Sequence, residues 1–149
     1  MPRPAPLRTA LVLLACILAF TLAAAAPATA APTRKEAKVL WKINKVRANY
    51  GRGKVRLRSG LQSGAHDWAV YLQRHNLFYH GSLASGVTEN IAWISCQRGW
   101  ARKIVRMWLN SPAHRANLLD RSARYLGVGV ATGSAFGFRC TQISVTRFK

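Results

Sequence analysis

Apolar residues recur at helical spacing in four stretches of the chain, and basic residues occupy the faces between them. In one stretch Ile104, Val105 and Trp108 form a stripe, while arginines and a lysine take the outward positions. The periodicity therefore predicts four amphipathic helices. They cover residues 34–50, 59–76, 100–110 and 112–119.

Two of these helices carry recognisable start signals. Ser59 and Gln62 have the spacing of a capping box, so we expect the second helix to start with reciprocal side-chain caps. Ser111 is a natural N-cap and Pro112 suits the first helical position. That placement puts His114 in the first turn, where the helix dipole disfavours imidazolium. We predict a neutral His114 ring that can ligate a metal or accept a hydrogen bond.

Shorter apolar runs predict strands. Residues 89–94 form one candidate, and residues 126–131 and 136–145 form an antiparallel hairpin around Thr132-Gly133-Ser134. A brief extended link at residues 55–57 alternates apolar and basic residues. Helices followed by a hairpin indicate an α+β fold, with helices packed on a small antiparallel sheet.

The first thirty residues have the pattern of a secretory signal. Arg3 and Arg8 precede an apolar run over residues 11–26, and Ala28-Thr29-Ala30 is a small-residue cleavage pattern. A membrane anchor is the rival interpretation, but the run is short for one. We therefore predict cleavage after Ala30, a single domain over residues 31–149, and a secreted, extracellular protein.

Two cysteines, Cys96 and Cys140, remain after that cut. In an oxidising compartment two remaining cysteines most simply form a disulfide. The alternative is a pair of buried free thiols. We predict the disulfide.

The charge is extreme: 23 Lys and Arg stand against 4 Asp and Glu. Arg3 and Arg8 precede the cut, so the mature chain carries 21 against 4, a net charge of +17. This balance favours anionic partners such as wall polymers or lipid headgroups, although solubility alone could also explain it. Export and the lack of a groove-reading motif argue against specific nucleic-acid binding. We expect a monomer.

The five tryptophans divide by position. Trp41, Trp68 and Trp108 fit helical stripes and are expected in the core. Trp93 and Trp100 are the better candidates for exposed contacts, and packing in the core is the equally weighted alternative for each.

Several segments in order resemble the motifs of one family. Residues 108–119, W-L-N-S-P-A-H-R-A-N-L-L, resemble "W-x-x-S-P-G-H-R-x-N-I-L". Residues 89–92, E-N-I-A, and residues 78–80, F-Y-H, resemble the family's "G-E-N-I-A" and "F-x-H". The chain resembles bacterial members of the CAP superfamily, the domain of cysteine-rich secretory proteins, antigen 5 and plant pathogenesis-related proteins. The match covers nearly the whole mature chain.

The resemblance implies an α-β-α sandwich and a secreted protein with a central cleft of two histidines and acidic groups. By position these cleft residues are His80, Glu89 and His114. The family is associated with lipid or sterol binding, and its histidines bind zinc in some members. One departure is Ser111, which stands where animal and plant members have a second cleft glutamate.

The cleft residues are compatible with three roles. His80 and His114, with Glu89, are a plausible but partial zinc set. Zinc or Glu89 could activate water for hydrolysis, but no oxyanion hole or triad is visible, and Ser111 is better explained as an N-cap. The histidines could instead be structural, hydrogen-bonded residues. We favour a noncatalytic binding module for lipid or anionic envelope polymer, and we leave the question of an enzyme open.

Overall fold

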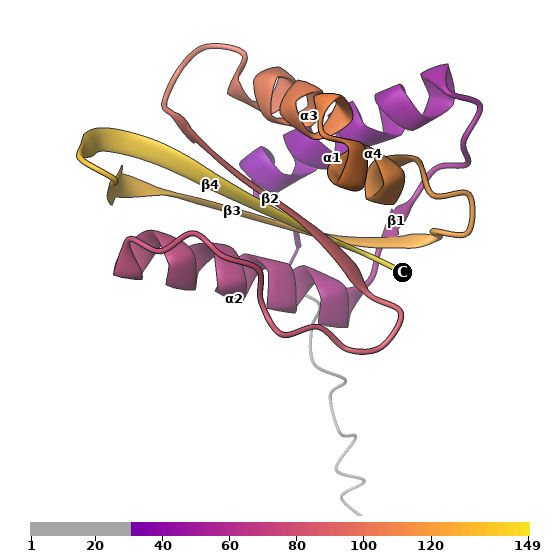
Figure 1. Cartoon of the computed structure of the whole chain (residues 1–149), viewed down its shortest axis with the longest axis horizontal. Helices are drawn as coiled ribbons and strands as arrows, with labels where there is room; N and C mark the ends of the chain where they lie inside the picture. The colour runs from indigo at the N-terminus through magenta and orange to yellow at the C-terminus, as the bar shows by residue number, and fades with distance from the viewer. Residues whose placement is uncertain (1–30) are drawn as a thin grey trace, which may run out of the picture.

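A computed structural model describes residues 31–149. The predicted signal peptide lies outside the described residues, so the cut after Ala30 and the domain limits stay predictions. The elements, in chain order, are α1 (Arg34–Asn49), β1 (Arg56–Leu57), α2 (Ser59–His75), β2 (Thr88–Ser95), α3 (Trp100–Asn110), α4 (Pro112–Leu119), β3 (Tyr125–Ala135) and β4 (Phe138–Phe148) (Figure 1). No helix in this part of the chain is long and apolar enough to cross a membrane.

The predicted α+β architecture with four helices is confirmed. The four strands form one sheet in the order β1-β3-β4-β2. The pairs β2–β4 and β3–β4 are antiparallel, as predicted, but β1 pairs with β3 in parallel. The sheet is therefore mixed, because the extended link after α1 lies along β3: Arg56 N donates to Arg124 O and Arg58 N donates to Leu126 O.

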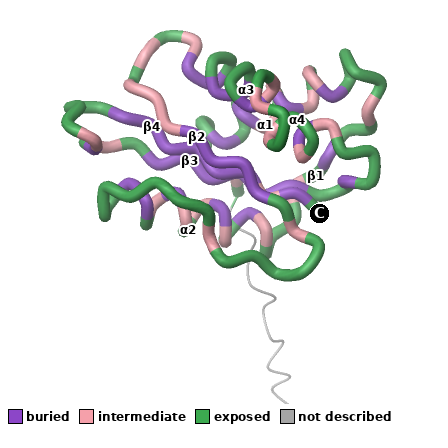
Figure 2. Tube along the Cα trace, viewed as in Figure 1, coloured by how far each residue is buried: buried purple, intermediate pink, exposed green. Residues whose placement is uncertain are grey.

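The molecule has three layers. Helix α2 alone covers one face of the sheet, and α1, α3 and α4 cover the other (Figure 1). The buried residues follow the sheet and the inner faces of these helices (Figure 2). Two apolar clusters result, one under α1, α3 and α4 and one between α2 and the sheet. This is the α-β-α sandwich that the resemblance implies.

Helix α2 lies directly on the backbone of β3. A Cβ added to Gly127 would come 1.9 Å from Leu61 O, and one added to Gly129 would come 1.9 Å from Ala65 O. Such distances leave room for glycine only. Gly127 and Gly129 therefore allow α2 to pack this closely on β3.

The predicted capping box of α2 is wrong. The helix includes Ser59, its N-cap is Arg58, and no side chain caps it. Gln62 is buried, donates to Val128 O and accepts from Val128 N. The Gln62 amide binds β3 and therefore cannot reach back to cap the helix.

The hairpin turn lies later than predicted. β3 extends through Thr132-Gly133-Ser134 to Ala135, with a register shift between Gly133 and Ala135. Phe136 and Gly137 turn the chain with φ of 53° and 77°. Two successive positive φ values are typical of the tight turns that suit antiparallel strands. The Gly-Ser signal thus marks an irregular strand end and not the turn.

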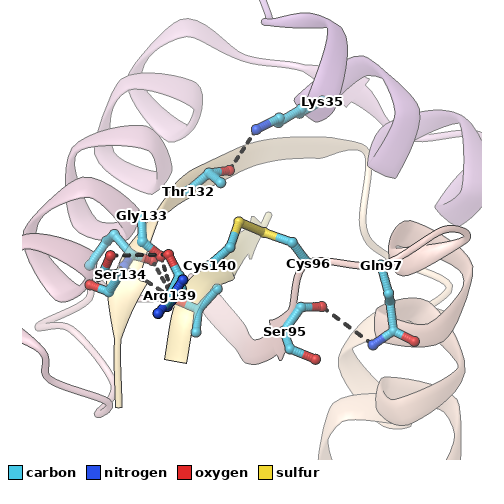
Figure 3. The surroundings of a disulfide bond; sticks show 11 residues. Lys35, Ser95, Cys96, Gln97, Thr132, Gly133, Ser134, Arg139 and Cys140 are labelled. Carbon is cyan, nitrogen blue, oxygen red and sulfur yellow. Dashed lines mark hydrogen bonds between the residues drawn. A yellow bond between two sulfur atoms is a disulfide. The ribbon is translucent and has the colours of Figure 1, made fainter. Parts of the chain in front are cut away.

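The disulfide predicted from the cysteine count is present between Cys96 and Cys140 (Figure 3). It links the segment just after β2 to β4, and Cys96 N also donates to Cys140 O. The bond spans 44 residues of sequence. It fixes the start of the loop that leads into α3.

Of the five tryptophans, one lies as predicted, two do not, and Trp68 and Trp93 are partly buried against the cluster between α2 and the sheet. Trp108 is buried, as expected. Trp41 is 55% exposed, because α1 buries a stripe through Val39 and Ile43 and Trp41 lies off that stripe. Trp100 is buried, because it lies four residues before Ile104 and extends the apolar stripe of α3.

Candidate functional site: a cleft of two histidines and a glutamate

The structure brings the three predicted cleft residues together from three segments. His80 lies in the loop after α2, Glu89 lies in β2, and His114 lies in the first turn of α4. The imidazole centroids of His80 and His114 are 6.2 Å apart, with the rings tilted by 45°. His80 and Glu89 are in direct contact, with 3.0 Å between Nδ1 and Oε1.

Glu89 uses both of its carboxylate oxygens. The side chain is fully buried, and Oε1 accepts from His80 Nδ1 at 3.0 Å and from Gly81 N at 3.1 Å. The other oxygen, Oε2, accepts from Arg147 Nε at 3.0 Å. A buried carboxylate with three donors is well satisfied. These bonds use three of the roughly four lone-pair positions of the carboxylate, so Glu89 has little capacity left to act as a base or metal ligand.

The Glu89 bond fixes the orientation of the His80 ring. Because an ionised carboxylate only accepts hydrogen bonds, His80 Nδ1 is the donor. In the neutral ring, Nε2 then carries the lone pair. The His80 side chain is 54% exposed. The chemistry that His80 can offer a ligand is therefore that of one nitrogen.

His114 has a depressed pKa. Burial lowers the pKa of the imidazole, and repulsion from His80 lowers it further. The sequence predicts a neutral ring from the helix dipole, and the structure supplies these two additional causes. Ser111 is the N-cap residue and Pro112 follows it, but the Ser111 side chain makes no capping hydrogen bond.

Two asparagines that sequence reasoning did not place in the cleft connect β2 to α4. The Asn90 side chain is buried and donates to His114 O at 3.0 Å. Asn117 Nδ2 donates to Asn90 Oδ1 at 2.9 Å and to Glu89 O at 3.3 Å. The first turn of α4, and His114 with it, is thus held against the strand that carries Glu89.

Arg147, in β4, is the other residue that sequence reasoning missed. A Cβ at Gly64 would come 2.7 Å from Arg147 Nη1, and one at Gly81 would come 2.8 Å from Nη2. The guanidinium therefore occupies a space that two glycines leave open. A carboxylate inside a predicted strand is a signal that a cation must lie nearby, but only the sheet register pairs residue 89 with residue 147.

An apolar pocket of about 460 Å³ lies beside His114. Aromatic, aliphatic and thioether side chains form most of its wall. The lining residues are Phe78, Ile91, Ala92, Trp93, Met107, Trp108, Ser111 and His114. Phe78 and Met107 are 43% and 47% exposed, so the pocket has an apolar entrance.

The cleft residues do not fit a complete zinc site. Zinc sites in proteins typically have three protein ligands with water, or four protein ligands. His80 and His114 supply two, and both Glu89 oxygens are already bonded. Residues 31–149 contain no group of three or more His, Cys, Asp and Glu side chains placed to hold a metal ion. The ligand set is that of a partial site at most.

The α-β-α sandwich and the cleft of His80, Glu89 and His114 are those that the resemblance to CAP domains implies. The sequence model of the Cysteine-rich secretory protein family, CAP, matches residues 40–145. The chain belongs to this family.

Solved structures share the fold. An outer surface protein from Borrelia burgdorferi matches with a TM-score of 0.57 and 17% identity, over 79% of this chain and 94% of that chain. An extracellular SCP-domain protein from Bacillus anthracis matches with 0.57 and 22%, over 76% and 39%. The structure of NaASP2 with Zn²⁺ matches with 0.54 and 13%, over 78% and 80%. The comparison with curated proteins gives no match.

Proposed function

We propose that this protein is a noncatalytic extracellular module that binds an anionic lipid or an anionic polymer of the cell envelope. The observation that carries the proposal is a positive charge that the fold leaves unneutralised. Arg147 is the only Lys or Arg in residues 31–149 that forms an ion pair with a carboxylate side chain. Arg47 is buried, and its guanidinium donates to backbone carbonyls. The other basic side chains are exposed or partly exposed and are available to an external anion.

Three of the four acidic residues are committed to internal bonds. Glu36 is buried, accepts from His66 Nδ1 at 2.7 Å and caps α1. Glu89 is bonded in the cleft. Asp120 accepts from the backbone and hydroxyl of Ser122, and these bonds lower the pKa of its carboxyl. These carboxylates therefore offer little compensation to the basic surface.

Three observations support a place outside the cell. The predicted signal peptide directs export. The Cys96–Cys140 disulfide is typical of an oxidising compartment. The structural relatives include an outer surface protein and an extracellular protein.

The apolar pocket supports a lipid among the anionic candidates. Ligand pockets are typically concave and mostly apolar with a few polar groups, and this pocket adds Ser111 and His114 to an apolar wall. Its exposed entrance at Phe78 and Met107 could admit an acyl chain. A purely polymeric ligand would use the basic surface and leave the pocket empty.

A zinc-dependent hydrolase is the alternative function. The neighbouring His80 and His114 rings and the relative with bound Zn²⁺ favour it, while Glu89, which already accepts three hydrogen bonds, disfavours it. Calorimetric zinc titration of the oxidised protein beside a His80→Ala/His114→Ala variant separates the two. We expect no tight one-to-one site in either protein. Stoichiometric binding lost in the variant would support the alternative and justify hydrolytic assays.

Vesicle binding tests the proposed function directly. We expect the protein to bind phosphatidylglycerol vesicles and not phosphatidylcholine vesicles. Raising salt from about 0.1 M to about 1 M shortens the Debye length from about 10 Å to about 3 Å, so binding to the anionic surface should weaken strongly. Equal binding to both vesicles, or binding that is insensitive to salt, would contradict the proposal. Poly(glycerol phosphate) in place of vesicles tests the polymer.

A further inference from the structure

A second cavity, lined by cations, lies between α1 and the start of α3. Its volume is about 350 Å³. Lys38 and Lys42 line it from α1, Arg98 lines it from the loop before α3, and Arg102 lines it from the first turn of α3. Gly99 completes the lining, so every side chain on the cavity wall that carries a charge is basic.

This arrangement is electrostatically unfavourable for an isolated domain. Lys38 and Lys42 are four residues apart on one helix, and like charges at that spacing repel each other. Arg98 and Arg102 add two more positive charges on the same cavity. Glu36, the only acidic residue of α1, is buried and bonded to His66 and to the α1 cap. An anion in the cavity would relieve the repulsion.

We propose that this cavity binds a phosphate-bearing anion with at least two closely spaced negative charges. Pyrophosphate, a phosphomonoester or consecutive phosphodiesters have that chemistry. Arginine guanidinium groups match phosphate oxygens in a forked geometry, and lysines contribute point charges. This proposal rests on the proposed function in one respect: it takes the phosphate to be part of an envelope lipid or polymer. It gives that phosphate a specific site, away from the histidine cleft.

The disulfide holds one wall of the site in place. Cys96 is joined to Cys140 just before the loop that carries Arg98, and Gln97 Nε2 donates to Ser95 O at 3.3 Å (Figure 3). Gly99 then turns the chain into α3 with a φ of 73°. Rigid placement of a cation reduces the entropy lost on binding. Reducing the disulfide should therefore weaken phosphate binding.

Trp41 provides an optical signal next to the site. Trp41 is 55% exposed, and Lys42 Nζ lies 4.4 Å from the centroid of its ring. An anion that pairs with Lys42 changes this cation–π contact. We expect pyrophosphate to alter the tryptophan emission of the native chain and to have much less effect on a Trp41→Phe variant.

The decisive test compares two charge-matched variants by calorimetric titration with pyrophosphate. Lys38→Gln/Arg102→Gln removes two lining cations, and Lys45→Gln/Arg106→Gln removes one exposed cation from each of the same helices outside the cavity lining. Loss of two charge-assisted contacts should weaken binding by about tenfold or more in the first variant. The second variant should stay within about twofold of the native protein, because diffuse surface charge contributes little per residue.

Other outcomes overturn the site. Equal weakening in both variants would mean diffuse attraction, and absent pyrophosphate binding would mean that the cavity holds no phosphate. Phosphatidylglycerol vesicles and poly(glycerol phosphate), titrated in parallel, distinguish a lipid from a polymer source. Vesicle or polymer binding without pyrophosphate binding would leave the proposed function standing and refute the site. Pyrophosphate binding alone would support the site and refute the function.

Discussion

The histidine cleft and the cavity between α1 and α3 differ in whether their charged side chains have partners within the protein. In the cleft, the Glu89 carboxylate has three hydrogen-bond donors, including Arg147. In the cavity, Lys38, Lys42, Arg98 and Arg102 meet around a space that no carboxylate lines. The charge of the cleft carboxylate is compensated by the protein's own donors, whereas only an external anion would compensate the cations of the cavity. The residues that the sequence marks as a candidate site, His80, Glu89 and His114, therefore do not show where this domain carries basic side chains without a carboxylate partner.

We expect the largest effect from removing the charged partner of Glu89 in the cleft. Arg147→Met leaves the fully buried Glu89 without its charged partner. Removing one member of a buried ion pair costs about 3–5 kcal/mol, so the free energy of unfolding should fall by about that amount. Denaturant-induced unfolding of the oxidised protein measures it.

The matched control for that change is Glu89→Gln/Arg147→Met. It removes both charges, so it should recover a large part of the stability that the single variant loses. A single variant as stable as the native protein would show that Glu89 does not depend on Arg147.

The next effect concerns the packing of α2 on β3. Gly129→Ala places a methyl group 1.9 Å from Ala65 O, and overpacking of this kind costs about 1–3 kcal/mol. Gly53→Ala is the control, because a Cβ there meets nothing within 4 Å. Thermal unfolding should show a lower midpoint for the first variant only. Equal midpoints would mean that α2 can move away from β3 at little cost.

The smallest effect is the pH dependence of His114. Its folded-state pKa lies below the unfolded value of about 6.5, so the unfolded chain takes up the proton more readily. Stability should therefore fall as pH drops through about 6.5 toward the folded-state pKa. The native protein should lose slightly more stability between about pH 7.5 and pH 5.5 than His114→Gln, which lacks the His114 imidazole. Equal losses would contradict the assigned pKa shift.

The sequence predicts the helices well because each buries an apolar stripe of period 3.6. It misplaces Trp41 because the stripe of α1 is narrow and includes the buried Glu36 and Arg47. It misses the parallel β1, a two-residue strand whose pairing depends on the distant β3. Local pattern carries no information on partners that are brought together only by the assembled sheet.

The same limit applies to the sites. The cleft residues His80, Glu89 and His114 are found together because the resemblance supplies their positions. Arg147 escapes detection because its pairing with Glu89 spans 58 residues. The sequence does not predict the basic cavity either. Its lysines and arginines have the pattern of ordinary solvated helix faces, and only the packing of α1 beside α3 brings them together.

The central claim is that the affinity for an anionic surface comes from the unpaired cations and not from the imidazoles of His80 and His114. The most direct measurement is the affinity for phosphatidylglycerol vesicles, at about 0.1 M salt, of the native protein, Lys38→Gln/Arg102→Gln and His80→Ala/His114→Ala. We predict about a tenfold loss in the lysine–arginine variant and a change within about twofold in the histidine variant. A loss confined to the histidine variant, with its fold intact, would contradict the claim.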